Sequence, residues 1–244
     1  MSSDVMAWMS RVEGVPPTGA SVLAVIAHPD EASFALGAIL DAFILAGARV
    51  EVLCLTHGQA WTLHGAPGDL AALRGAELAS AADVLGPARA KMQDLPDGAL
   101  GQVSPARLVD EVVAGAGSCS ADVLLVFDAA EAAGHRDHVT ATSAALLAAE
   151  RLDVPVLGWA LSKTAAAQLS QQPGGGFIGQ RGRDTDIRVS LERARQRLAS
   201  RDHSGQTLPG SAGQSQLELF VDRQSVRWLR PPRGREAGRP ATSD

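Results

Sequence analysis

The chain has 244 residues, of which 45% are hydrophobic and 20% charged, and this composition is typical of a globular protein with a substantial core. A net charge of −5 and only two cysteines give no support for a nucleic-acid partner, a disulfide framework or a cysteine-based zinc site. No apolar run reaches the ~18 residues of a membrane span, and residues 1–19 lack the pattern of a signal peptide, so we expect a cytoplasmic protein.

Strand-like and helix-like segments alternate from residue 22 to residue 159. The predicted strands are Val22–Ala27, Arg49–Thr56, Ala88–Gln93, Val123–Phe127 and Val154–Trp159. The predicted helices are Ser33–Ala46, Asp69–Leu85, Ser104–Gly115 and His138–Leu152. Such alternation is typical of parallel strands joined by right-handed crossovers. We therefore expect an α/β protein with a Rossmann-like three-layer fold and a mostly parallel sheet.

The segments after residue 160 are shorter and less regular. They comprise a loop at Gln171–Arg183, a strand at Ile187–Val189, a helix at Leu191–Arg201, and a terminal β-hairpin built from Leu217–Val221 and Ser225–Leu229. We expect residues 1–19 to form an N-terminal extension, residues 20–230 one domain, and residues 231–244 a disordered tail. The sequence leaves the oligomeric state open, and a homo-oligomer is compatible with it.

A histidine and two carboxylates follow the first predicted strand, in the segment Ala27–Glu31. Ligands bind beyond the carboxyl ends of strands in open α/β sheets. His28 and Glu31 are three residues apart, which places both on one face of a helical turn, and their side chains are suitable zinc ligands. Asp30 lies between them and could bind a metal-bound water. Alternatively, Asp30 only caps the following helix.

A second polar cluster, Gly134–His138, follows the strand Val123–Phe127. His135 and His138 have the same spacing as His28 and Glu31, and Asp137 lies between them. Taken alone, each histidine could be an ordinary surface residue. If the two preceding strands are neighbours in the sheet, however, both clusters face one crevice. The sequence therefore predicts a divided metal site.

The remaining polar motifs are weaker. His57 and His64 flank a Gly-rich loop and are most simply loop histidines. The dinucleotide-binding glycine fingerprint is absent after the first strand, which argues against NAD. His203 and Ser204 lack the elbow motif of a nucleophilic serine.

The two clusters resemble the signatures of the PIG-L/LmbE family of zinc-dependent N-deacetylases, which includes the N-acetylglucosaminyl-phosphatidylinositol deacetylase. The first family signature, A-H-P-D-D-E followed by S-F-x-L-G, is similar to residues 27–37, and the second, G-H-P-D-H, is similar to residues 134–138. Weaker similarities occur at Leu55–Ala60, Arg74–Glu77 and Arg195–Gln196. The resemblance extends over roughly residues 20–230.

This resemblance implies that His28, Glu31 and His138 hold a zinc ion, and Fe²⁺ could occupy the same ligands. It implies that Asp30 is the general base. Two departures from the signature concern this metal set. Glu31 stands where the family usually has Asp, and Ala32 stands where it usually has Glu.

The resemblance also implies roles for three further residues. His135 would be the general acid or would stabilise the oxyanion, Asp137 would orient His135, and Arg74 would contact the substrate. The expected protein is a zinc-dependent hydrolase that removes an N-acetyl group from an amino sugar or a related small metabolite. Two alternatives stay open: a family amidase acting on a thiol conjugate or natural-product intermediate, and a catalytically weakened homologue that only binds a small molecule.

Overall fold

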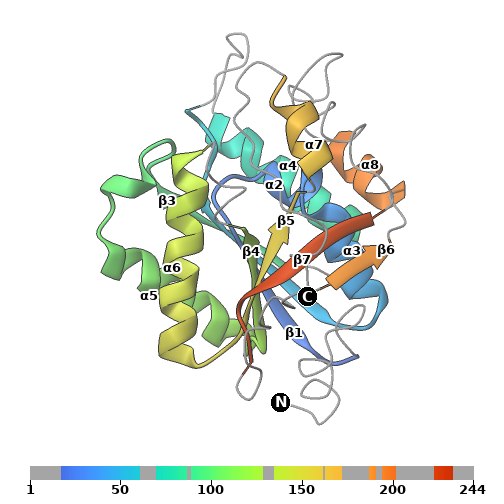
Figure 1. Cartoon of the computed structure of the whole chain (residues 1–244). Helices are drawn as coiled ribbons and strands as arrows, with labels where there is room; N and C mark the ends of the chain where they lie inside the picture. Colours follow the sequence, from blue (N-terminus) through green and yellow to red (C-terminus); the bar gives the residue numbers. More distant parts are fainter. Residues whose placement is uncertain are drawn as a thin grey trace.

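The computed structural model describes residues 18–60, 70–86, 89–128, 135–161, 163–171, 187–190, 194–201 and 223–232. These residues contain one seven-stranded sheet with the order β3-β2-β1-β4-β5-β7-β6 (Figure 1). Its strands are β1 (Ser21–Ile26), β2 (Arg49–Thr56), β3 (Arg89–Leu95), β4 (Val123–Phe127), β5 (Val156–Ala160), β6 (Ile187–Ser190) and β7 (Arg223–Arg230). The predicted extension at residues 1–19, the loop at 171–183 and the tail at 231–244 lie almost entirely outside the described residues.

Within the described ranges, at least one helix lies between each strand and the next along the chain. They are α2 (Glu31–Phe34), α3 (Gly37–Leu45), α4 (Leu70–Leu85), α5 (Pro105–Cys119), α6 (Arg136–Leu152), α7 (Lys163–Leu169) and α8 (Ala194–Arg201). A short 3₁₀ helix covers Leu100–Gln102. None of these helices is long and apolar enough to cross a membrane.

Two apolar cores lie on opposite faces of the sheet, as the three-layer prediction requires. Residues Val22, Ala24 and Ile26 of β1 pack in the core that includes α3, whereas Leu23 and Val25 pack against α5 and α6. Figure 1 shows α5 and α6 on one side of the sheet and α3, α4 and α8 on the other. Every residue of β1 and β4 is buried, which explains why both strands are apolar runs without polar alternation.

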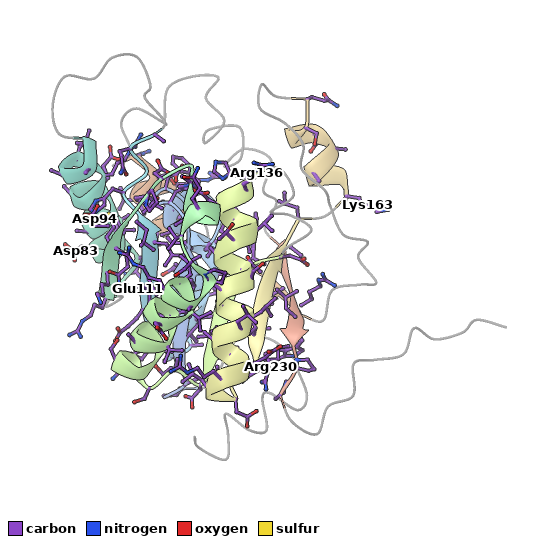
Figure 2. The ribbon with its side chains drawn as sticks, turned by 90° about the vertical axis from the view of Figure 1, so that its left-hand side faces the viewer. Asp83, Asp94, Glu111, Arg136, Lys163 and Arg230 are labelled. Carbon is purple, nitrogen blue, oxygen red and sulfur yellow. The ribbon has the colours of Figure 1, made fainter. Side chains whose placement is uncertain are left out.

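Strands β1 to β5 pair in parallel, and β7 pairs antiparallel with both β5 and β6. Figure 2 shows Arg230, the end of β7, at the opposite end of the molecule from Arg136, where α6 begins. The strand pairings confirm the predicted mostly parallel α/β fold with an antiparallel C-terminal part. Strand β7 begins at Arg223, two residues before the predicted strand Ser225–Leu229. The predicted partner strand Leu217–Val221 lies outside the described residues.

The predicted helix Ser33–Ala46 is two helices in the structure, α2 and α3. The carbonyl groups of Ser33 and Phe34 accept hydrogen bonds from the side chain of Gln196 in α8. A residue distant in sequence therefore binds the main chain at the point where one continuous helix was expected. Both cysteines, Cys54 and Cys119, are buried and free.

The sheet order places β1 beside β4, with Val22 opposite Val123. The chain moves outward from β1 to β2 and β3, and then returns to the other side of β1 as β4. The carboxyl ends of β1 and β4 therefore form the topological switch point of the sheet, where α/β proteins of this kind bind ligands.

Candidate metal centre and active site

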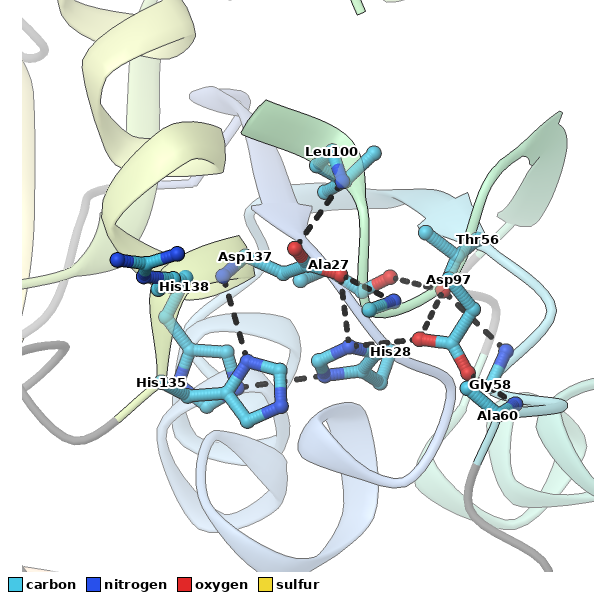
Figure 3. Close-up of polar contacts among 12 residues, drawn as sticks. Ala27, His28, Thr56, Gly58, Ala60, Asp97, Leu100, His135, Asp137 and His138 are labelled. Atoms are coloured by element: carbon cyan, nitrogen blue, oxygen red, sulfur yellow. Dashed lines mark hydrogen bonds and ion pairs between the residues drawn. The ribbon is translucent and has the colours of Figure 1, made fainter. Parts of the chain in front are cut away.

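The switch point brings the two polar clusters of the sequence together. His28 follows β1, and His138 lies in the first turn of α6. Helix α6 is the first helix after β4, and the segment between them lies outside the described residues. The ring centroids of the two histidines are 5.3 Å apart (Figure 3). The condition stated for a joint site, that β1 and β4 are neighbours, is confirmed.

Three side-chain atoms from the two clusters converge on one point. Nδ1 of His28 lies 2.9 Å from Oε1 of Glu31 and 3.3 Å from Nε2 of His138. The same Oε1 atom lies 2.5 Å from Nε2 of His138. The extra methylene of Glu31, compared with aspartate, therefore does not prevent its carboxylate from reaching the two histidines.

Glu31 is 7% exposed, and each of its carboxylate oxygens has a distinct partner. Oε1 faces the two histidines, whereas Oε2 accepts a hydrogen bond of 3.0 Å from the main-chain N–H of Ala27. Burial alone would raise the pKa of this carboxyl. The charge and hydrogen bonds of His138 and His28 outweigh burial and hold the pKa far below its usual value. The carboxylate is therefore ionised.

The spacing of the two histidine nitrogens and the donor types of the cluster suit a divalent metal ion. Ligand atoms of tetrahedral zinc stand about 3.3 Å apart, given metal–ligand distances of about 2.0–2.1 Å. The separation of 3.3 Å between His28 and His138 matches this value. Oε1 of Glu31 lies at hydrogen-bonding distance from both nitrogens, 2.9 and 2.5 Å, and would have to move outward to bind the same ion. Two imidazoles and one carboxylate are a donor set that suits zinc.

Behind His28 lies an aspartate that sequence reasoning missed. Nε2 of His28 is 3.0 Å from Oδ1 of Asp97 and 3.6 Å from Oδ2 of Asp137. Burial lowers the pKa of His28, but hydrogen bonds to Asp137, Asp97 and Glu31 raise it well above its usual value. A carboxylate on the far nitrogen is the common arrangement for a metal-bound histidine. The signal was available, because Asp97 follows the carboxyl end of β3.

Asp97 and Asp137 are themselves held by main-chain N–H groups. Asp97 accepts from Ala60 at 2.6 Å, and Asp137 accepts from Gly98 at 2.7 Å and from Leu100 at 3.1 Å (Figure 3). His28, Asp97 and Asp137 also lie close enough together to be considered a ligand group. Because Nε2 of His28 faces these two carboxylates while its Nδ1 faces Glu31 and His138, we take the aspartates as hydrogen-bond partners of His28 and not as ligands.

His135 is the N-cap residue of α6, and its Nδ1 atom accepts the main-chain N–H of Asp137 at 3.3 Å. Burial and the positive charges of His28 and His138 lower the pKa of His135. An acceptor at Nδ1 and a lowered pKa assign the neutral ring, with its proton on Nε2. The ring stacks on His138 at a centroid distance of 4.8 Å. The predicted start of this helix at His138 is two residues too late.

Asp30 occupies the N-cap position of α2, yet its side chain makes no capping hydrogen bond. The capping alternative therefore does not account for this carboxylate. Asp30 lies between His28 and Glu31 in the same turn, so it is adjacent to the proposed ligands along the chain.

The sequence model of the PIG-L family, described as GlcNAc-PI de-N-acetylase, matches residues 23–149. This range is more than half of the chain and contains both polar clusters. The chain belongs to the PIG-L/LmbE family of deacetylases. A comparison with curated protein sequences finds no match.

Several solved structures superpose on most of the chain. The A40926 pseudoaglycone deacetylase Dbv21 has a TM-score of 0.66 at 20% identity, covering 86% of this chain and 97% of its own. The N,N′-diacetylchitobiose deacetylase from Pyrococcus horikoshii has a TM-score of 0.62 at 16% identity, covering 86% and 84%. The 4-carboxy-2-hydroxymuconate hydratase GalB from Pseudomonas putida has a TM-score of 0.67 at 15% identity, covering 90% and 100%. At these identities the likeness shows the fold, and the hydratase shows that this fold serves more than one reaction.

Two residues of this PIG-L/LmbE protein lie differently from what their expected roles suggest. Asp137 contacts His135 through its main-chain N–H, while its carboxylate faces Gly98 and His28. Arg74 is 5% exposed, and its Nη1 atom lies 2.8 Å from Oε2 of Glu77 within α4. Among the described contacts, Arg74 is thus paired within its own helix and does not touch the histidine cluster.

Proposed function

We propose that this protein is a zinc-dependent hydrolase that removes an N-acetyl group from an amino sugar or a related small metabolite. The observation that carries the proposal is the convergence of His28, Glu31 and His138 at the switch point. These three residues would hold the metal, which we propose to be Zn²⁺, with Fe²⁺ as the alternative. A zinc ion bound there lowers the pKa of a coordinated water toward neutrality and polarises the amide carbonyl.

We assign the general base to Asp30. A carboxylate adjacent to two ligands can take a proton from the attacking water as the bond to the carbonyl carbon forms. When the carbon–nitrogen bond then breaks, the departing nitrogen takes a proton back from Asp30. The products at this point are acetic acid and the neutral amine, and transfer of the acid proton to the amine gives acetate and an ammonium group.

We assign oxyanion stabilisation to His135. Its Nδ1 atom is occupied by the N–H of Asp137, so Nε2–H is the donor that the ring can offer to a substrate. A neutral donor aimed at the developing oxyanion stabilises the transition state without a proton transfer of its own. Asp137 would support both histidines, His135 through its main chain and His28 through its carboxylate.

A substrate contact by Arg74 remains a prediction. The guanidinium group is buried against Glu77, so it would have to share that partner with a sugar hydroxyl or exchange it on binding. Asp97 joins the proposed site as the residue that orients His28.

The catalytically weakened homologue is the second candidate, because Ala32 replaces the glutamate that the family signature places beside the metal set. Metal analysis and an acetate-release assay separate the two candidates. The proposal predicts about one zinc per chain after gentle purification and acetate release from N-acetylglucosamine derivatives. Zinc binding without turnover on N-acetyl sugars, thiol conjugates or natural-product amides favours the binding homologue. A protein that neither retains zinc nor gains activity with added metal contradicts the proposal.

A further inference from the structure

We propose that Gln196 of α8 is a positioning residue that holds α2, and with it Glu31, in place for metal binding. This inference rests on the proposed function, because it takes Glu31 to be a metal ligand. Gln196 lies well beyond residues 23–149, which the family model matches.

The side chain of Gln196 is 0% exposed and binds the main chain of α2 twice. Nε2 donates to the carbonyl oxygen of Ser33 at 3.0 Å and to that of Phe34 at 3.0 Å. A glutamine side-chain amide has two N–H donors, so both are directed at this short helix. Glu31 is the first residue of the same helix.

A helix of four residues is not stable by itself. Within α2, the carbonyl of Glu31 accepts from the N–H groups of Ala35 and Leu36, at 3.2 and 3.0 Å. The last carbonyls of a helix have no partner inside it, and Gln196 supplies the partners for two of them. The backbone that carries Glu31 is therefore held from outside, by a residue more than 160 positions away.

The close approach of Gln196 depends on a glycine. A Cβ atom at Gly37 would lie 3.0 Å from Cγ of Gln196 and 3.1 Å from the carbonyl oxygen of Ala32. Both distances are tighter than ordinary contacts, so a larger residue would push Gln196 away from α2. Gly37 and Gln196 therefore form a matched pair at this contact.

Helix α8 makes a second side-chain contact with a neighbouring helix, and this contact offers a matched control. Nη1 of Arg195 lies 2.7 Å from Oδ1 of Asp41 in α3, a helix without a proposed metal ligand. Figure 1 shows α8 beside α3 and α4. Two adjacent residues of α8 thus anchor it to two different helices, and only Gln196 anchors the helix that carries Glu31.

The test compares Gln196→Met, which keeps the length but has no donor, with Arg195→Gln and the parent protein. Zinc affinity is measured by competition with a chromophoric chelator, and thermal unfolding of the metal-free proteins is measured alongside. We expect Gln196→Met to weaken zinc binding about tenfold or more, the range seen when a residue that supports a metal ligand is lost. Arg195→Gln should lower the unfolding temperature but leave zinc affinity within about twofold. Hydrogen exchange at the amides of Ala35 and Leu36 should accelerate in Gln196→Met alone.

Zinc affinity in Gln196→Met equal to that of the parent overturns this inference and leaves the proposed function intact. Equal losses of affinity in both variants also overturn it, because they indicate a general loss of stability. A parent protein without zinc affinity overturns the proposed function, and this inference with it. If Gln196→Met does not fold, Gln196→Asn, whose amide is too short to reach α2, is measured instead and read in the same way.

Discussion

Oε1 of Glu31 lies 2.5 Å from Nε2 of His138, and this contact joins two segments from distant parts of the chain into one candidate site. The longer arm of Glu31 is accommodated because its other oxygen binds the N–H of Ala27 at 3.0 Å. The carboxylate is thus fixed at both oxygens before any metal arrives. The departure from the family signature at this position is therefore compatible with an organised metal site.

The substitution Glu31→Asp should weaken zinc binding rather than improve it, although it restores the residue usual in the family signature. An aspartate is one methylene shorter, so it cannot hold the N–H of Ala27 and face both histidines at once. We expect a loss of affinity of about tenfold or more, since ligand misplacements of about 1 Å are costly. Chelator competition measures it, with Glu31→Gln as the control of equal length. Tighter zinc binding by Glu31→Asp would show that the native arrangement is strained.

Removing the carboxylate behind His28 should also weaken the metal site. The substitution Asp97→Asn leaves the shape but removes the charge that holds Nε2 of His28, 3.0 Å away. We expect zinc affinity to fall about 10–100-fold. The control is Asp94→Asn, because Asp94 lies in β3 three residues before Asp97 and its side chain is 96% exposed. Equal affinities of the two variants would exclude a role for Asp97 in orienting His28.

The substitution His135→Gln distinguishes a donor from a metal ligand. Nitrogen atoms of His28, His135 and His138 all lie within 4.8 Å of one another, so a three-histidine ligand set is a geometric alternative. Our assignment predicts unchanged zinc affinity and acetate release reduced about 10²–10³-fold, the usual cost of losing one oxyanion donor. Loss of zinc from His135→Gln would instead identify His135 as a ligand.

The stability of the metal-free protein should decrease on both sides of a mildly acidic pH range. The pKa of His28 is raised in the folded protein. The stability that protonated His28 contributes is therefore fully present below its usual pKa of 6.5, and it is lost as the pH rises through the folded-state pKa. The pKa values of Glu31 and Asp97 are lowered, so their contribution is present above their usual values and is lost as the pH falls through the folded ones. Thermal unfolding in a chelator, from pH 2 to pH 10, measures both limbs. His28→Gln should flatten the alkaline limb, and an unchanged limb would show that another group causes it.

Much of the sheet could be predicted from the sequence, because strands buried on both faces are continuous apolar runs. The predicted strands Arg49–Thr56 and Val123–Phe127 agree with β2 and β4 in both bounds. The two clusters could be placed at strand ends for the same reason. That they share one crevice depended on β1 and β4 being neighbours, which the sequence alone left conditional.

The contacts that complete the site had no local signal or only a weak one. Asp97 lies in a segment of turn residues, where an aspartate is ordinary. Gln196 falls in the weak family similarity at Arg195–Gln196, but its partners are the carbonyls of Ser33 and Phe34, which no side-chain pattern reveals. The bond from Glu31 to the N–H of Ala27 depends on a side-chain conformation that only the packed structure determines.

The most direct test of the account is a crystal structure of the zinc-loaded protein, with the metal located by anomalous scattering at the zinc edge. We predict one ion at about 2.0–2.2 Å from Nδ1 of His28, Oε1 of Glu31 and Nε2 of His138, with His135 outside its coordination shell. An ion bound by His135 in place of Glu31, or no ion at the carboxyl ends of β1 and β4, would contradict it.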